Sequence, residues 1–252
     1  EQDNTYTFSY DEQWIQNGFE LSPALKFNNI KNNAVKYFVE NLLPEGRGLD
    51  EVSQLFHISK AHKFAILRAL GLDTSGGLIF LPNKKYEVHT SFREIKEDEL
   101  KERIAKKDTI PIILWDKKPR LSVAGVQEKL PLLLMDGKIG FGEGELCSTH
   151  ILKFNRKGEN VTLNEYISLK LCESIGLNVA NVEYKNISNE HILFVERFDR
   201  KIIDQNKVER THVIDSVQAL GLPVSYKYER VYGSNSELKD FREGVSWKKL
   251  FD

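Results

Sequence analysis

Hydrophobic residues in the first part of the chain recur at the spacing of short helices. One helix is predicted over residues 35–42, where a Pro-Glu-Gly sequence ends the apolar pattern. Two more are predicted over residues 49–56 and 64–70. The turn between them offers Ser59 as the N-cap of the later helix, and Gly71 marks the end of that helix.

Two apolar runs and one charged stretch follow. Residues 78–81 and 110–115 each predict a short strand, and the second is apolar enough to be buried. Residues 93–107 predict an exposed helix, because opposite charges lie four positions apart along it. These pairs are Glu97 with Lys101 and Glu99 with Arg103.

The second half has the pattern of an antiparallel sheet with one helix among its strands. Residues 130–135 and 138–141 flank Asp136-Gly137, which is typical of a two-residue hairpin turn. Further strands are predicted at 150–154, 179–184 and 191–195, and helices at 163–175 and 213–220. This succession predicts an α+β fold in which a helix packs on the sheet.

The segment 116–119 has the composition of a linker between the two halves. We therefore predict a small N-terminal α/β subdomain over residues 1–116. A second domain, built on the antiparallel sheet, is predicted over residues 117–252.

Composition excludes several classes of protein. The 252 residues carry 36 Lys and Arg against 37 Asp and Glu, so a protein that coats nucleic acid through net positive charge is not expected. No apolar run approaches the roughly 20 residues of a membrane span, and the start lacks the pattern of a signal peptide. The two cysteines, Cys147 and Cys172, favour the reducing cytoplasm over a disulfide scaffold. We interpret the sequence as a fragment, or as one lobe of a larger protein.

Two motifs have a structural and a chemical interpretation. Residues 55–60 lie between two predicted helices, which is the layout of a DNA-reading helix-turn-helix. An ordinary helical hairpin is favoured, because the chain is not basic, and we expect no direct DNA binding. Residues 140–144 (Gly-Phe-Gly-Glu-Gly) are predicted to form a flexible hairpin loop. They lack the spacing of a phosphate-binding loop, and Glu143 would repel phosphate.

Three further segments could bind a phosphorylated ligand. Residues 120–129 are small and glycine-containing, so their N–H groups could surround phosphate, although a plain turn explains them equally well. Lys153 ends an apolar strand, where it could bind phosphate oxygens or extend to solvent at a sheet edge. Glu165 on the next helix is its candidate partner, as in the lysine–glutamate pair of protein kinases.

The third segment, residues 195–200, has two arginines and two acidic residues around an aromatic one. A surface salt-bridge cluster is the favoured interpretation. The connector between the lobes of a kinase, where backbone groups meet adenine, is the alternative.

Taken together, these segments resemble the HipA family of bacterial serine/threonine kinases, the toxins of HipBA toxin–antitoxin modules. The matching stretches keep the family's order along nearly the whole chain. They are FVENLLPEG at 38–46, ALGLDTSGGLIFL at 69–81, SVAGVQEK at 122–129, THILK at 149–153, NEY at 164–166, VERFDR at 195–200, and QALGLP at 218–223 with KYE at 227–229.

The resemblance implies a role for each matching residue. It makes SVAGVQEK the phosphate-binding loop, with Ser122 as an autophosphorylation site. Lys153 becomes the lysine that binds ATP phosphates, with Glu165 as its partner. The residues expected to bind ATP are Ala124, Gly125, Val126, Gln127, Lys153 and, in the adenine-facing connector, Glu196, Phe198 and Asp199. ATP and Mg²⁺ are the implied cofactors, and residues 117–252 would be a kinase-like N-lobe.

The resemblance also implies partners and an activity. Some members phosphorylate an aminoacyl-tRNA synthetase, which halts translation and promotes persistence, and the partner is a HipB-like helix-turn-helix antitoxin that binds operator DNA. The family's catalytic aspartate and metal-binding aspartate lie in a C-lobe, and no D-x-H-x-K-N-like segment occurs in these residues. We therefore expect no catalytic residue, no metal ligand and no activity in this chain alone. The alternative is a non-catalytic module that binds an antitoxin or regulates a kinase.

Overall fold

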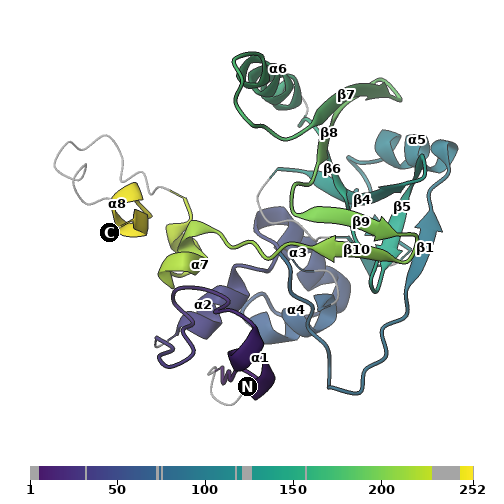
Figure 1. Cartoon of the computed structure of the whole chain (residues 1–252). Helices are drawn as coiled ribbons and strands as arrows, with labels where there is room; N and C mark the ends of the chain where they lie inside the picture. Colours follow the sequence, from purple (N-terminus) through teal and green to yellow (C-terminus); the bar gives the residue numbers. More distant parts are fainter. Residues whose placement is uncertain are drawn as a thin grey trace. The chain divides into compact units, whose positions relative to one another are not determined.

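A computed structural model describes residues 6–31, 33–71, 74, 76–116, 118–120, 127–156, 158–228 and 245–251 (Figure 1). The chain forms two compact units. The first unites Glu1–Leu43 with Val213–Asp252, and the second is Pro44–His212. The boundary predicted at residue 116 falls inside the second unit, and the division into domains there stays a prediction.

The first unit is helical and joins segments from both ends of the chain. Its elements are α1 (Glu12–Asn17), α2 (Ala34–Glu40), α7 (Ser216–Leu220), the 3-10 helix η1 (Val224–Tyr226) and α8 (Trp247–Phe251). Gln218 links them: its side chain donates to the carbonyl of Phe38 at 3.1 Å, and its own carbonyl accepts from Ser22 Oγ at 2.7 Å. Asp215 and Gln218 also form a capping box that starts α7.

The second unit begins with two helices, α3 (Gly46–Phe56) and α4 (Lys63–Leu70), which contact each other. His57 ends α3 in the left-handed conformation, with φ of 54°. These helices and α2 confirm the predicted ones. The N-cap prediction is wrong, because α4 begins after His62 and Ser59 Oγ accepts from Ala61 N inside the connection.

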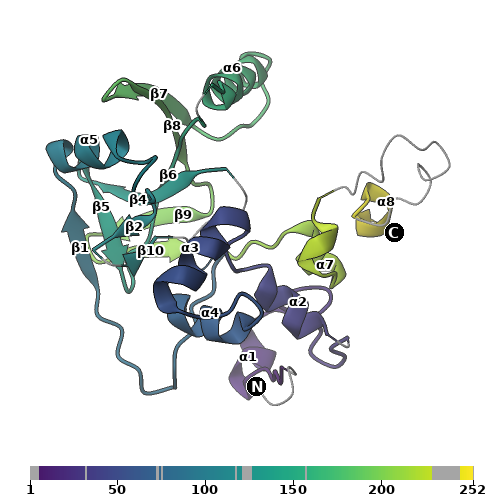
Figure 2. The same cartoon turned by 180° about the vertical axis from the view of Figure 1, so that it is seen from behind.

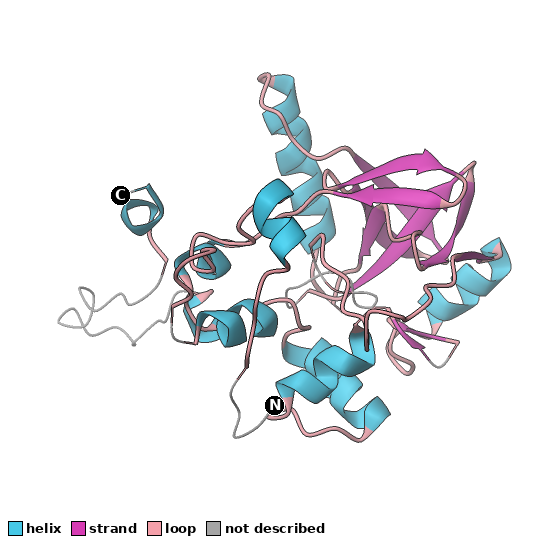
Figure 3. Ribbon diagram, turned by 60° about the horizontal axis from the view of Figure 1, so that its bottom comes forward, coloured by secondary structure: helices cyan, strands magenta, loops and turns pink. Residues whose placement is uncertain are grey.

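A six-stranded antiparallel sheet, in the order β1-β5-β4-β6-β8-β7, forms the body of this unit. Figure 3 shows its strands gathered together in magenta. The strands are β1 (Ser91–Glu94), β4 (Lys129–Met135), β5 (Lys138–Glu143), β6 (His150–Lys153), β7 (Val182–Ile187) and β8 (Glu190–Glu196). The hairpin β4–β5 is as predicted, and Asp136 and Gly137 both have positive φ, as a tight hairpin turn requires. The predicted α+β fold class and antiparallel sheet are confirmed.

Both faces of the sheet are covered, which explains why β4 is almost continuously apolar. On one face, α6 (Val161–Ser174) packs against β7 and β8. A small hairpin of β9 (Arg200–Asp204) and β10 (Lys207–Arg210) covers the same face near β4 and β5, through Val208 against Leu133 (Figure 1). The other face, where Trp115 packs on Phe141 at 5.3 Å between ring centroids, is seen in Figure 2.

Several predicted elements are wrong. Residues 78–81 form no strand, because the amide of Phe80 bonds to the carbonyl of Gly71 rather than to a sheet partner. Residues 110–115 are mostly a buried turn, and only β2 (Leu114–Trp115) is extended; it pairs with β3 (Lys118–Pro119), where a linker was expected. The segment 93–107 splits into the end of β1 and the helix α5 (Glu97–Ala105).

The flexible loop predicted at residues 140–144 is also wrong. Gly140 and Gly142 lie within β5 and pair with β1. A Cβ at Gly140 would collide with the carbonyl oxygen of Arg93 and lie 2.6 Å from the ring of Phe92. Glycine is therefore needed there for close approach of two strands, not for flexibility. Among the described helices, none is long and apolar enough to cross a bilayer.

Candidate functional site

Lys153 and Glu165 form an ion pair between the central sheet and the helix packed on it. Lys153 ends β6, and its Nζ lies 2.5 Å from Glu165 Oε1 on α6. Their side chains are 22% and 28% exposed, so the pair is largely shielded yet open to a ligand. The contact between strand lysine and helix glutamate is as predicted from the sequence.

The start of α6 is fixed by the chain just after β6. The amide of Thr162 donates to Asn155 Oδ1 at 3.0 Å, which satisfies one free N–H of the first turn. Tyr166 and Leu169 then pack against the buried residues of β7 and β8. Because Glu165 precedes Tyr166 on the same turn, the packing of α6 places its carboxylate against Lys153.

A second lysine lies beside this pair. Lys129 on β4 is directly opposite Lys153 in the sheet register, so both side chains project from the same face. Lysine ammonium groups are compact point charges that can bind phosphate oxygens. Gln127, two residues earlier, is half-buried. The predicted loop residues Ser122, Ala124, Gly125 and Val126 lie outside the described residues.

The predicted connector is the turn between β8 and β9. Glu196 is exposed and accepts a hydrogen bond from Asn181 Nδ2 at 2.9 Å. Phe198 is 84% exposed. Arg197 and Asp199, on either side of Phe198, are buried, so an exposed aromatic ring is held between two anchored neighbours.

Asp199 is the centre of a buried ion cluster. Its carboxylate receives two hydrogen bonds from Arg197, at 2.9 and 2.8 Å, and one from Arg200 at 2.6 Å. Burial opposes ionisation, but the bonds and charges of the two arginines outweigh it and hold the pKa of Asp199 below its ordinary value. The favoured interpretation of residues 195–200 as a surface cluster is therefore wrong.

The cluster also connects the turn to distant parts of the unit. Arg197 Nη1 bonds to Ser148 Oγ at 3.0 Å, just before β6. Arg200 Nη2 donates to the carbonyl of Gly76 at 2.6 Å. These links to Ser148 and Gly76 were not predicted. The alternation Arg-Phe-Asp could have indicated them in part, because in an extended chain it puts Arg197 and Asp199 on one side and Phe198 on the other.

The described part of this site presents lysine side chains and one carboxylate, and not a group of metal-ligating side chains. Within the described ranges, no group of three or more His, Cys, Asp or Glu side chains is placed to hold a metal ion. The shielded Lys153–Glu165 pair and the neighbouring Lys129 fit the phosphates of a nucleotide.

Two family models match this chain. One described as the HipA N-terminal domain matches residues 1–81, and one described as the HipA-like C-terminal domain matches residues 121–249. The serine/threonine-protein kinase toxin HipA of Shewanella oneidensis is 44% identical over 250 residues, which are 98% of this chain and 58% of that protein. The putative kinase Y4mE of Sinorhizobium fredii is 32% identical over 232 residues, which are 88% of this chain and 55% of that protein.

A solved structure shows the same fold. It is the complex of Shewanella oneidensis HipA with HipB and its operator DNA, with a TM-score of 0.81 and 44% identity. The match covers 96% of this chain and 57% of the solved one. The chain thus spans little more than half the length of these relatives.

Proposed function

The chain belongs to the HipA family, and from that premise we propose that it is the ATP-binding part of a serine/threonine protein kinase, the toxin of a type II toxin–antitoxin module. The observation that carries this proposal is the ion pair between Lys153 and Glu165. Kinases use such a pair to hold a lysine against nucleotide phosphates.

Each residue then has a defined task. Lys153 binds phosphate oxygens, and Glu165 orients its ammonium group. Glu196 and Phe198 belong to the connector that faces the adenine. Asp199 holds this connector in place through its buried ion pairs with the two arginines. Gln127, Ala124, Gly125 and Val126 belong to the phosphate loop, and phosphorylation of Ser122 in it would compete with ATP for the same donors. ATP with Mg²⁺ supplies the phosphoryl group to be transferred.

Equilibrium binding of a fluorescent ATP analogue to the 252-residue chain tests this proposal. Lys153→Met should weaken binding at least tenfold, and Glu165→Gln should weaken it less, because the lysine remains but is no longer oriented. Lys170→Met is the matched control: Lys170 is on the same helix and pairs with Glu173 at the surface. Equal affinity of Lys153→Met and the unaltered chain would contradict the proposal.

A HipB-like antitoxin is the proposed partner. The solved relative is a complex with HipB and operator DNA, which supports this partner and supports DNA contact through the antitoxin. A protein substrate such as an aminoacyl-tRNA synthetase follows from the family resemblance alone. The two free cysteines agree with a cytoplasmic protein.

The alternative function is a non-catalytic module that binds an antitoxin or regulates a kinase. Such a module needs no D-x-H-x-K-N segment, and none occurs within these 252 residues. The nucleotide experiment separates the two, since a pure binding module needs no ATP affinity that depends on Lys153.

A further inference from the structure

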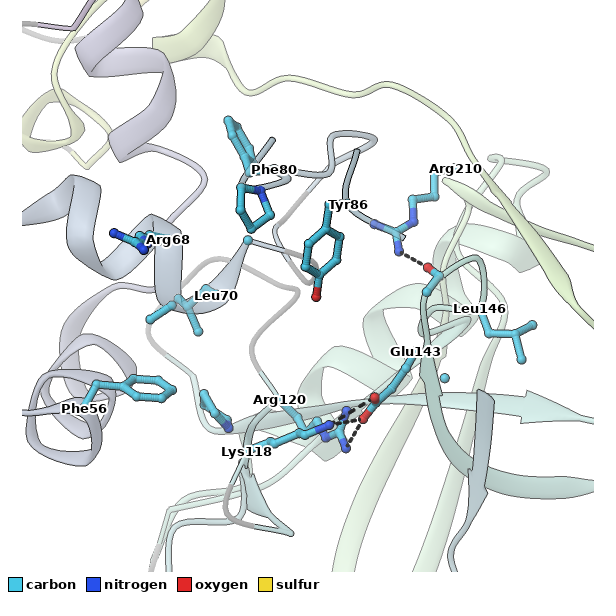
Figure 4. A pocket seen from close by; sticks show the side chains of 16 residues that line it. Phe56, Arg68, Leu70, Phe80, Tyr86, Lys118, Arg120, Glu143, Leu146 and Arg210 are labelled. Carbon is cyan, nitrogen blue, oxygen red and sulfur yellow. Dashed lines mark hydrogen bonds and ion pairs between the residues drawn. The ribbon is translucent and has the colours of Figure 1, made fainter. Parts of the chain in front are cut away.

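A cavity of about 360 Å³ lies in the second unit, apart from the Lys153–Glu165 pair (Figure 4). Its described lining comes from α3, α4 with Gly71 after it, the segment that holds Phe80, Pro82 and Tyr86, β3 with Arg120 after it, the end of β5 with the turn after it, and β10. The elements β6 and α6, which carry the proposed nucleotide residues, contribute none of the described lining. The volume is that of a site for a small molecule.

The polar groups of this cavity are mostly cationic. Lys118 and Arg120 both contact Glu143, at 2.8 and 3.3 Å, and Arg210 bonds to the carbonyl of Gly144 at 3.4 Å. Burial opposes ionisation of Glu143, but the hydrogen bond from Lys118 and both positive charges prevail and lower its pKa. Glu143 is therefore charged, and these three cations exceed it by two.

Arg120 is the most constrained of these cations. It is 8% exposed, and its guanidinium lies 4.4 Å from the centroid of the Phe141 ring. Among the described residues, Arg120 Nε has no hydrogen-bond partner. A buried donor without a hydrogen bond raises the free energy of the folded protein. An anionic ligand that accepts a hydrogen bond from this guanidinium would lower it.

The remaining walls are apolar and aromatic. Leu70, Phe80 and Leu146 line the cavity, and Figure 4 shows the hydroxyl of Tyr86 pointing into the space between Leu70 and Glu143. Such walls bind a hydrophobic body, while the few convergent polar groups fix its orientation.

We propose that this cavity binds a small organic anion, with one phosphate or carboxylate group carried on an aromatic body. The anionic group lies against Arg120 and Lys118, with Arg210 adding positive charge from the other side of Glu143, and the ring lies against Leu70 and Phe80. This site does not depend on the proposed kinase function.

Phenyl phosphate is a suitable probe, because its two halves can be tested separately as phenol and inorganic phosphate. Amide chemical shifts in the ¹⁵N spectrum of the full chain report where it binds. We expect saturable shifts centred on Gly142, Gly144 and Leu146, with tighter binding of phenyl phosphate than of either half. Shifts centred on Lys153, or equal binding of inorganic phosphate, would overturn the proposal.

Two variants test the site itself. Ala69→Trp fills the cavity from an exposed helix position without removing charge, and Arg210→Ala removes one cation. Each should weaken phenyl phosphate binding at least fivefold while the melting temperature stays close to that of the unaltered chain. Lys207→Ala, which removes a positive charge from the same strand outside the cavity, should bind normally. Unchanged binding by Ala69→Trp would also overturn the proposal, because a ligand in the cavity cannot tolerate that side chain.

Discussion

At the scale of single residues, the ion cluster around Asp199 shows that a run of charged residues, which usually lies at the surface, can instead be buried. Isolated surface pairs contribute little to stability, whereas buried pairs become costly when one member is removed. Asp199 pairs with two buried arginines at once, so its loss removes the carboxylate that both of them share.

We predict that Asp199→Asn lowers the free energy of unfolding by about 3–5 kcal/mol at neutral pH, the usual cost of breaking a buried ion pair. Chemical denaturation of both proteins measures this difference. Glu183→Gln is the matched control, because Glu183 pairs with Lys185 at the surface and should change stability by less than about 1 kcal/mol.

The pH dependence of the Asp199 effect follows from its lowered pKa. A carboxyl whose folded pKa lies below the unfolded value of about 3.9 stabilises the fold above that pH. This stabilisation is lost as the pH falls through the folded pKa. The stability difference between the unaltered chain and Asp199→Asn should therefore be full above about pH 4 and shrink in more acidic solution. A difference that grew on acidification would contradict the assignment of the cluster.

At the scale of elements, the glycine in the β4–β5 turn and the glycine inside β5 have different physical roles. Gly137 has φ of 74° and no atom within 4 Å of an added Cβ, so its constraint is conformational. Gly140 has an added Cβ in collision with the backbone of β1, so its constraint is steric. The edge strand β1 can approach β5 closely enough to pair with it only because residue 140 is a glycine.

Gly137→Ala should destabilise the fold by about 1–2 kcal/mol, the cost of a left-handed conformation. Gly140→Ala should cost about 3 kcal/mol, because backbone and a packed ring must shift. Amide hydrogen exchange distinguishes them further: Gly140→Ala should speed exchange in β1, while Gly137→Ala should leave β1 protected. Equal effects of the two substitutions on β1 would contradict this explanation.

At the scale of the whole molecule, the two units differ in how they are built. The second unit is one continuous segment and contains the whole six-stranded sheet. The first needs residues from both ends of the chain, as the bonds of Gln218 to Ser22 and Phe38 show.

A polypeptide of residues 44–212 should therefore fold alone and unfold cooperatively, whereas residues 1–43 alone should not fold. Circular dichroism with thermal unfolding measures both. A broad, non-cooperative transition for residues 44–212 would show that the sheet depends on the first unit.

Catalysis is the second prediction at this scale. The 252-residue chain, incubated with ATP and Mg²⁺, should place no phosphate on Ser122, because its sequence holds no D-x-H-x-K-N segment to supply a base and metal ligands. Mass spectrometry of the intact chain detects the added phosphate. Full-length HipA of Shewanella oneidensis, named as a kinase, is the positive control. Stoichiometric phosphate on the chain alone would refute the prediction.

The sequence by itself determined the elements whose signals are local. The helices α3, α4 and α6, the hairpin at Asp136-Gly137 and the strand ending at Lys153 follow from spacing and turn chemistry within a few residues. The partnership of Lys153 and Glu165 was also accessible, because a strand and the helix that follows it pack together in a compact sheet layer.

Only the tertiary structure decided which distant segments meet. The pairing of β1 with β5, the burial of Asp199 between two arginines and the cavity beside Arg120 all join residues far apart in the chain. The strand predicted over residues 110–115 is wrong except at Leu114–Trp115. An apolar run indicates that residues are buried, but it does not indicate which backbone groups form hydrogen bonds with one another. Hydrogen-bond partners and local dielectric are set by the neighbours that folding brings together, and no spacing within the sequence records them.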